Sequence, residues 1–201
     1  MTATLSIEKK QAVVTNDQIL PKRISWEAFK ADYLEREDGF KYEWVNGTVE
    51  KTPRSMNRKQ FYIVINLVRY FEQLYAKGKV TGSLVPEGDT FFGENHSRPD
   101  VAYYTDEQIE SAADDDVAEP QFIIEIISTT DEMNRVHRKM KDYRASEIPV
   151  IWHILPELHE VHVFHGRKSE IFIGDEICSA APVLPKFQMS VNAIFKRKVT
   201  V

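Results

Sequence analysis

The chain has 201 residues, which suits one domain with a full hydrophobic core and leaves no room for two large domains. Its hydrophobic fraction of 42% and charged fraction of 28% are ordinary for a soluble globular protein. The net charge of −5 argues against a protein that holds nucleic acid by bulk electrostatics, so the local distribution of Lys and Arg matters more than the total.

The sequence shows no sign of membrane targeting or of disulfide chemistry. No apolar run approaches the roughly 18 residues of a membrane span, and the N-terminus lacks the apolar stretch of a signal peptide. The single cysteine, Cys178, excludes an internal disulfide and makes a cysteine-based zinc site implausible. We expect a cytoplasmic protein without a membrane partner. Residues 1–20 are expected to form a flexible arm, and residues 21–201 a single domain.

Capping residues and turn residues mark the elements along the chain. Ser25 is suited to cap a helix over 26–37, and Gly78 to end a long helix over 57–77. That long helix is so widely apolar that we expect it to pack on more than one side, with part of it available to a second subunit. Asn46-Gly47 predicts a β-hairpin. Short apolar runs bounded by turn residues predict strands at 42–45, 48–51, 80–85, 90–92, 101–104, 122–128, 150–155, 159–165 and 170–173.

The segment 105–119 is acidic, with Asp106-Glu107 and Asp114-Asp115-Asp116. An acidic loop could repel nucleic acid or touch a cation. The segment lacks the glycine and the fixed spacing of a calcium loop, so we interpret it as a solvated surface loop.

Two carboxylates stand out because of where they fall in the strand pattern. Glu125 lies within the run 122–128, where apolar residues on both sides predict burial on both faces of a sheet. A charge buried there needs a partner. Asp100 begins the preceding strand and could converge with it, but two like charges disfavour ionisation unless a cation lies between them. Oxygen ligands favour Mg²⁺ or Mn²⁺ over zinc.

The helix after this strand predicts a third group. Asp131 is a plausible N-cap, and Val136, Met140 and Tyr143 fall within about 60° of one another on a wheel of roughly 100° per residue. Lys139 projects at the edge of that buried face, whereas Lys141 points to solvent. Lys139 is therefore the lysine that can reach a site on the sheet, where its ammonium could hold an attacking water or a phosphoryl oxygen.

These motifs together resemble the Uma-type restriction endonucleases, a branch of the PD-(D/E)XK nuclease superfamily. The likeness covers about 25–164, and its motifs are Pro99-Asp100, Glu125-Ile126-Ile127-Ser128, Lys139-Met140-Lys141-Asp142-Tyr143, Trp152 and Tyr42-Glu43-Trp44-Val45-Asn46-Gly47. The superfamily motif places a lysine two residues after the acidic residue, a position that Ile127 occupies here. The branch is understood to have moved this lysine onto the following helix, which fits Lys139.

The resemblance implies roles for five residues. Asp100 and Glu125 would bind the metal, with the backbone carbonyl of Ile126 as a further ligand. Lys139 would be the catalytic lysine, expected beside a cation to titrate low enough to help take a proton from water. Glu43 would be an additional acidic group near the metal, although strand alternation alone favours an exposed side chain. The sequence departs from the family pattern at Asn57, Val150-Ile151-Trp152 and Leu155-Pro156.

Two groups of basic residues could face DNA. The first is Arg54, Arg58 and Lys59, and the second, on the helix after Glu125, is Arg135, Arg138, Lys139, Lys141 and Arg144. The alternative for both is a solvated surface.

The sequence therefore predicts an α/β domain with a restriction-endonuclease-like core, in which helices flank a central mixed β-sheet. We expect a Mg²⁺- or Mn²⁺-dependent endonuclease acting on DNA, as a homodimer because one such site cuts one strand. One alternative is a catalytically silent nucleic-acid-binding or assembly module with the same fold. Another is a glycosidase using Asp100 and Glu125, which leaves Lys139 and the basic helix unexplained.

Overall fold

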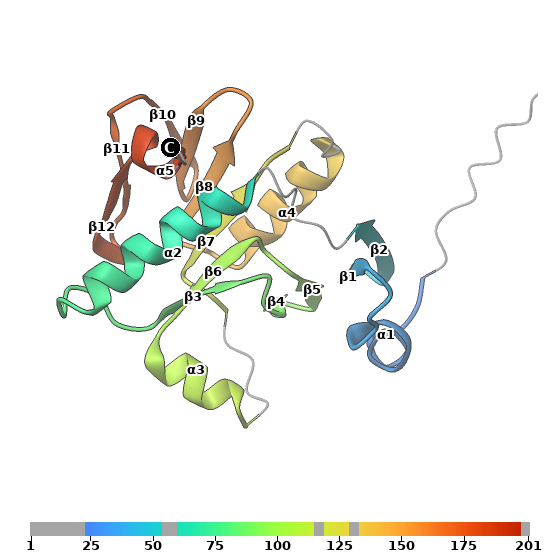
Figure 1. The fold of residues 1–201 in the computed structure, drawn as a ribbon. Helices are drawn as coiled ribbons and strands as arrows, with labels where there is room; N and C mark the ends of the chain where they lie inside the picture. Colours follow the sequence, from blue (N-terminus) through green and yellow to red (C-terminus); the bar gives the residue numbers. More distant parts are fainter. Residues whose placement is uncertain (1–22, 54–59, 115–118, 129–132, 198–201) are drawn as a thin grey trace, which may run out of the picture.

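The computed structural model describes residues 23–53, 60–114, 119–128 and 133–197 (Figure 1). The predicted arm, 1–20, lies outside these ranges, as do Asp131 and the basic group Arg54, Arg58 and Lys59.

The described chain begins with a short helix and a hairpin. The helix α1 spans Trp26–Phe29, and the side chain of Ser25 accepts a hydrogen bond from the Ala28 N–H, as predicted for an N-cap. The chain then continues as a π-helix over Lys30–Leu34, so the predicted helix over 26–37 is present but ends at Leu34. Strands β1, Phe40–Val45, and β2, Thr48–Pro53, form the predicted hairpin.

The turn of this hairpin confirms the prediction from its sequence. Asn46 and Gly47 both have positive φ, at 50° and 80°, which is the backbone that a two-residue type I′ turn requires. The register places Glu43 opposite Glu50, so both carboxylates lie on the same face of the hairpin.

A six-stranded mixed sheet forms the centre of the fold, which confirms the predicted architecture. Its order is β10-β9-β8-β7-β6-β3, with β7 and β8 parallel and every other neighbouring pair antiparallel. The strands are β3 Ser83–Pro86, β6 Val101–Tyr104, β7 Phe122–Ile126, β8 Val150–Leu155, β9 Glu160–His165 and β10 Lys168–Ile173. The helix α4, Met133–Ala145, connects the two parallel strands, as parallel neighbours require.

Different elements cover the two faces of this sheet. On one face, α2, Phe61–Tyr75, packs together with α5, Val191–Ile194, and strand β12, Leu184–Ser190, over a large apolar cluster that includes Trp152 and Phe187. On the other face, Met140 and Tyr143 of α4 pack over Ile123 and Ile151. Side chains alternate along a strand, so Glu125 shares the α4 face with Ile123. Fully burying each large apolar side chain contributes about 1.5–3 kcal/mol.

A second sheet carries the hairpin to the edge of this core. Its order is β2-β1-β5-β4, where β4 spans Thr90–Phe92 and β5 spans Asn95–Ser97. The sequence did not predict strand β12, nor the two short strands β5 and β11, Ile177–Ala180, of which β11 pairs with β12. Both short strands contain polar residues, which weakens the alternating pattern on which the prediction depends.

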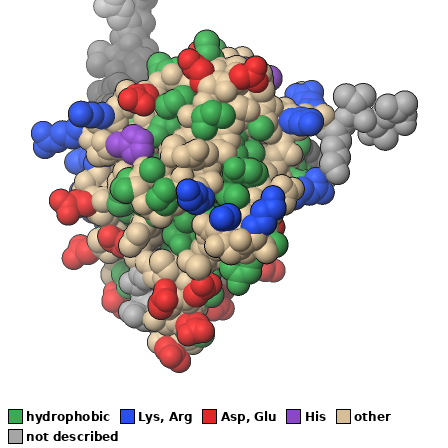
Figure 2. Space-filling model, turned by 90° about the vertical axis from the view of Figure 1, so that its left-hand side faces the viewer, with side chains coloured by type: hydrophobic (Ala, Val, Ile, Leu, Met, Phe, Trp, Pro, Cys, Tyr) green, Lys and Arg blue, Asp and Glu red, His purple; other side chains and the backbone are tan. Residues whose placement is uncertain are grey.

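The first part of the acidic segment 105–119 was wrongly predicted as a loop, and residues 115–118, with Asp115 and Asp116, lie outside the described residues. Residues Asp106–Ala112 form helix α3, because Thr105 and Gln108 make a reciprocal capping box at its start. Acidic side chains gather at the lower end of the molecule (Figure 2), the end where Figure 1 places α3. Within the described ranges, no helix is long and apolar enough to cross a membrane.

Candidate active site

Glu125 lies at the centre of the site, on the α4 face of strand β7. Its side chain is only 8% exposed, which an isolated carboxylate could not sustain. Two groups from α4 contact the same oxygen. The Lys139 Nζ lies 3.0 Å from Glu125 Oε1, and the Tyr143 hydroxyl donates a short hydrogen bond to it. Lys139 and Tyr143 are four residues apart, one helical turn, so α4 presents both to the strand.

Asp100 lies beside Glu125 on the neighbouring strand. It immediately precedes β6, and its Oδ2 accepts a hydrogen bond of 2.6 Å from the backbone N–H of Ile126. Burial and the negative charge of Glu125 raise the pKa of Asp100 to about 6, against the opposing influence of Lys41 and Lys139. The predicted convergence of the two carboxylates is therefore present, together with the repulsion expected of two like charges.

Glu43 is the second carboxylate in contact with Lys139, and it belongs to the hairpin. Its Oε1 lies 3.1 Å from the Lys139 Nζ and accepts hydrogen bonds from the Ser97 hydroxyl, at 2.9 Å, and the Arg98 N–H, at 2.8 Å. The residue is 1% exposed, so the interpretation as an exposed strand residue is wrong. Burial alone would raise its pKa, but the charges of Lys139 and Lys41 with these hydrogen bonds lower it well below the usual range.

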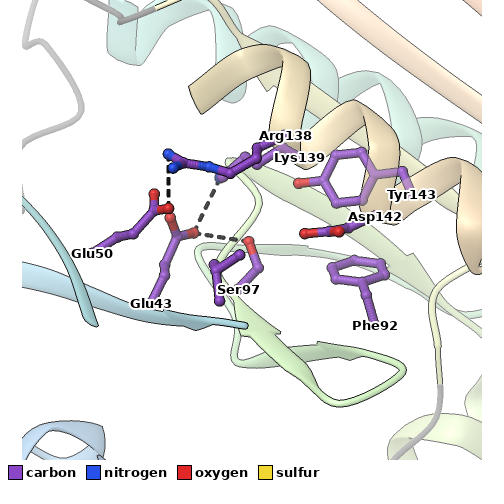
Figure 3. Close-up of a pocket in the computed structure, with 9 residues that line it drawn as sticks. Glu43, Glu50, Phe92, Ser97, Arg138, Lys139, Asp142 and Tyr143 are labelled. Carbon is purple, nitrogen blue, oxygen red and sulfur yellow. Dashed lines mark hydrogen bonds and ion pairs between the residues drawn. The ribbon is translucent and has the colours of Figure 1, made fainter. Parts of the chain in front are cut away.

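Lys139 thus lies between two carboxylates, Glu125 and Glu43, that come from different sheets. Figure 3 shows its contact with Glu43. Burial acts to lower its pKa, but the charges of Glu125 and Glu43 outweigh burial and raise the pKa well above its ordinary value. This direction applies to Lys139 among its protein neighbours, and the lowered pKa expected beside a bound metal cation stays a prediction. The Lys139 ammonium therefore stays protonated at neutral pH. Its contacts with Glu43 and Glu125 link the hairpin to the central sheet.

Lys41 is a second cation that the sequence analysis missed. It lies two residues before Glu43, on the same face of β1, and its side chain is 12% exposed. Its Nζ donates a short hydrogen bond to the Arg98 carbonyl and lies 3.9 Å from Glu43 Oε1. Side chains two residues apart in a strand lie on the same face, so the assignment of Glu43 to the site could have predicted Lys41 as well.

The predicted DNA-facing residues are only partly described. Arg138 lies at the rim of a small pocket lined also by Glu43, Glu50 and Lys139, and its guanidinium pairs with Glu50 Oε1 at 2.7 Å (Figure 3). The charge of Arg135 acts on the same glutamate. Arg58 and Lys59 lie outside the described residues.

The donor atoms around Asp100 fit a hard divalent cation. They are the carboxylates of Asp100 and Glu125, with the carbonyl of Ile126 adjacent in the chain, all of them oxygens. Within the ranges that the structure describes, no three His, Cys, Asp or Glu side chains form a metal-binding group. Mg²⁺ is commonly held by one or two carboxylates and keeps several waters, so this set suits it better than a metal that needs a closed protein shell.

Comparison with known proteins places the chain in a family. A solved structure of a "putative nuclease belonging to DUF820" from Anabaena variabilis superposes with a TM-score of 0.65 at 18% identity, covering 77% of this chain and 89% of that one. No curated protein matches the sequence significantly. The sequence profile of the Uma2 family, described as "Putative restriction endonuclease", matches residues 26–192. The chain therefore belongs to the Uma2 family.

Proposed function

We propose that this protein is a Mg²⁺- or Mn²⁺-dependent endonuclease that hydrolyses phosphodiester bonds of DNA. The observation that carries the proposal is the position of the Lys139 ammonium, which contacts Glu125 at the point where Asp100 approaches from the neighbouring strand. Two carboxylates and a lysine that converge at one end of the neighbouring strands β6 and β7 fit phosphodiester hydrolysis. Membership of the Uma2 family and the likeness to a nuclease structure support the same class of reaction.

The residues of the site have different roles in the proposed hydrolysis. Asp100, Glu125 and the Ile126 carbonyl would hold the divalent ion. When bound, that ion supplies Lewis-acid polarisation of a phosphoryl oxygen and lowers the pKa of a coordinated water. Lys139 donates hydrogen bonds that orient the attacking water or stabilise charge on the phosphoryl group. The water oxygen forms a bond to phosphorus and gives up a proton to solvent, the phosphorus bond to the leaving oxygen breaks, and the leaving oxygen takes up a proton, so the net reaction consumes one water.

Glu43 supports the site from the hairpin. Its Oε1 already pairs with the Lys139 ammonium and accepts hydrogen bonds from Ser97 and the Arg98 backbone, so its first role in this proposal is to hold the ammonium in place. Removal of the Glu43 charge should therefore misplace Lys139 without removing any of the three metal ligands.

The test combines metal binding with cleavage. Calorimetric titration with Mn²⁺ and Mg²⁺ should show binding that is lost in Glu125→Ala. Plasmid DNA should be cut only with metal, and neither Asp100→Asn nor Lys139→Met should cut it. Lys168→Met is the control, because it removes the same charge from an exposed position on the edge strand β10, outside both basic groups considered for DNA. Cleavage retained by Asp100→Asn or Lys139→Met, at wild-type rates and in folded protein, would overturn the assignment.

A silent nucleic-acid-binding module is the second candidate. The observation that favours it is that the Lys139 ammonium, with Lys41 nearby, already pairs with the buried carboxylates of Glu43 and Glu125, as in a structural ion-pair network. This candidate predicts a mobility shift of DNA that needs no Mg²⁺ and no cleavage of DNA. It also predicts that Glu125→Ala and the wild type give the same result in the metal titration.

We also propose a twofold dimer, since cutting both strands needs two sites. Phe61, Ile65 and Tyr75 of α2 are 46%, 42% and 50% exposed. At about 100° per residue they fall within roughly 80° on one side of the helix. This apolar face is suited to a second copy of the chain.

A further inference from the structure

The ion pair between Arg138 and Glu50 stands next to the proposed catalytic lysine. Arg138 and Lys139 are consecutive on α4, so their side chains diverge by about 100°. Lys139 reaches Glu43 and Glu125, whereas Arg138 reaches Glu50 on β2 at 2.7 Å. Figure 3 shows the two glutamates side by side on the hairpin, each facing one of the two cations.

Glu50 is the fixed member of this pair. Its side chain is 14% exposed and belongs to a strand of the hairpin, whose turn is tied down where the Asn46 N–H donates to Asn95 Oδ1 at 2.8 Å. It lies directly opposite Glu43, a placement of like charges that is destabilising in a sheet unless cations compensate. Burial raises the pKa of Glu50, the charge of Glu43 adds to the rise, and Arg138 opposes it.

Arg138 is the member that can move. Its side chain is 47% exposed, and it lies at the rim of the pocket formed by Glu43, Lys139 and Tyr143. A guanidinium binds a phosphate with the same fork of N–H donors that it offers to a carboxylate. A nucleic acid backbone that places one phosphate at Lys139 must bring a neighbouring phosphate past this rim.

We propose that Arg138 is the binding site for a phosphodiester group adjacent to the scissile one, and that Glu50 is a built-in competitor that holds Arg138 until the substrate displaces it. The proposal rests on the proposed nuclease function and extends it to substrate binding. Glu50 holds the Arg138 guanidinium in an ordered position beside the site. It thereby lowers the affinity of the protein for any polyanion that does not also bind at Lys139. It is therefore a positioning residue, and its effect on binding passes through Arg138.

The test measures binding of a fluorescein-labelled DNA duplex by anisotropy in EDTA, over a salt series of about 50–200 mM. Glu50→Gln keeps the shape of the side chain and should tighten binding roughly three- to tenfold, because the phosphate no longer competes with a carboxylate for Arg138. Arg138→Ala should weaken binding and lower the slope of log affinity against log salt by about 0.9, the value of one lost phosphate contact. In the double variant the gain from Glu50→Gln should vanish.

Glu170→Gln is the matched control, since it makes the same charge change on the exposed edge strand β10, which β8 and β9 separate from β7. The proposal is overturned if Glu50→Gln binds no more tightly than Glu170→Gln, or if its gain persists in the Arg138→Ala background, where only direct repulsion remains. An unchanged salt slope in Arg138→Ala also overturns it, and this variant tests the site even if Glu50→Gln proves poorly folded. Failure of the wild type to bind DNA in EDTA overturns this proposal alone, whereas the nuclease proposal fails if plasmid DNA is not cut with Mg²⁺ or Mn²⁺, which distinguishes the two.

Discussion

Replacing Lys139 by methionine should destabilise the fold more than any other single lysine substitution in α4. The side chain is 15% exposed and its Nζ contacts Glu43 at 3.1 Å and Glu125 at 3.0 Å. Loss of one member of a buried ion pair costs about 3–5 kcal/mol, because the opposite charge stays buried without a partner. Glu43 still has contacts with Lys41, Ser97 and the Arg98 N–H in this variant. We therefore expect a loss of unfolding free energy at the lower end of this range, about 3 kcal/mol. The free energy of unfolding of a domain is typically about 5–15 kcal/mol, so the variant should remain folded.

The assay is equilibrium urea unfolding followed by tryptophan fluorescence at neutral pH. Lys141→Met, at an exposed position of the same helix, should stay within about 0.5 kcal/mol of wild type. Adding Glu43→Gln to Lys139→Met should recover about 1–2 kcal/mol, because the second substitution removes one of the two buried carboxylate charges that have lost the Lys139 ammonium. Equal stability of Lys139→Met and Lys141→Met would refute the reasoning, since it would mean that the ion pairs with Glu43 and Glu125 contribute nothing measurable.

Three further predictions test other parts of the structure. Tyr143→Phe removes the hydroxyl that donates to buried Glu125 and should cost about 1–2 kcal/mol, seen as a lower melting temperature in calorimetry. Asp89 accepts from His96 and Arg98, and although burial opposes this, these contacts lower its pKa from 3.8 to about 2. The unfolded chain therefore takes up the proton first, so this stabilisation is complete above pH 4 or so and is lost toward pH 2. Because the side chain is 48% exposed, screening limits the effect to about 1 kcal/mol, and Asp89→Asn should flatten the acid limb of the stability profile. Ile65→Glu should convert a wild-type dimer to a monomer in light scattering; a monomeric wild type would refute the dimer.

The sequence was sufficient for elements with a strong local signal. Asn46-Gly47 specifies its turn because few residues tolerate positive φ at both positions. The run around Glu125 specifies a strand buried on both faces, and its neighbours on α4 follow from the helical period. Thr105 and Gln108 also have the spacing of a capping box, which predicts a helix. The segment of α3 was nevertheless predicted as a loop because the prediction rested on its acidic composition and not on the cap.

What could not be predicted depends on long-range packing. Nothing local to Glu50 indicates a partner at Arg138, because the contact exists only once the hairpin has docked against α4. The burial of Glu43 has the same origin, since strand alternation cannot tell which face of a hairpin another element will cover. Both residues acquire their roles from a second sheet that includes β5, a strand of three residues with a weak pattern of its own.

The parallel pair β7 and β8 also has a consequence for how the protein opens. Glu125 and Lys139 belong to one contiguous strand-helix-strand unit, whereas Glu43 comes from a hairpin distant in the sequence and joined to that unit through charged side chains. Amide hydrogen exchange should therefore be slowest in the central strands and faster in the hairpin, as a separate cooperative unit. Transient undocking of the hairpin would uncover Lys139 while leaving Glu125 in an intact sheet, which provides a route by which a long polymer reaches a side chain that is nearly closed to solvent.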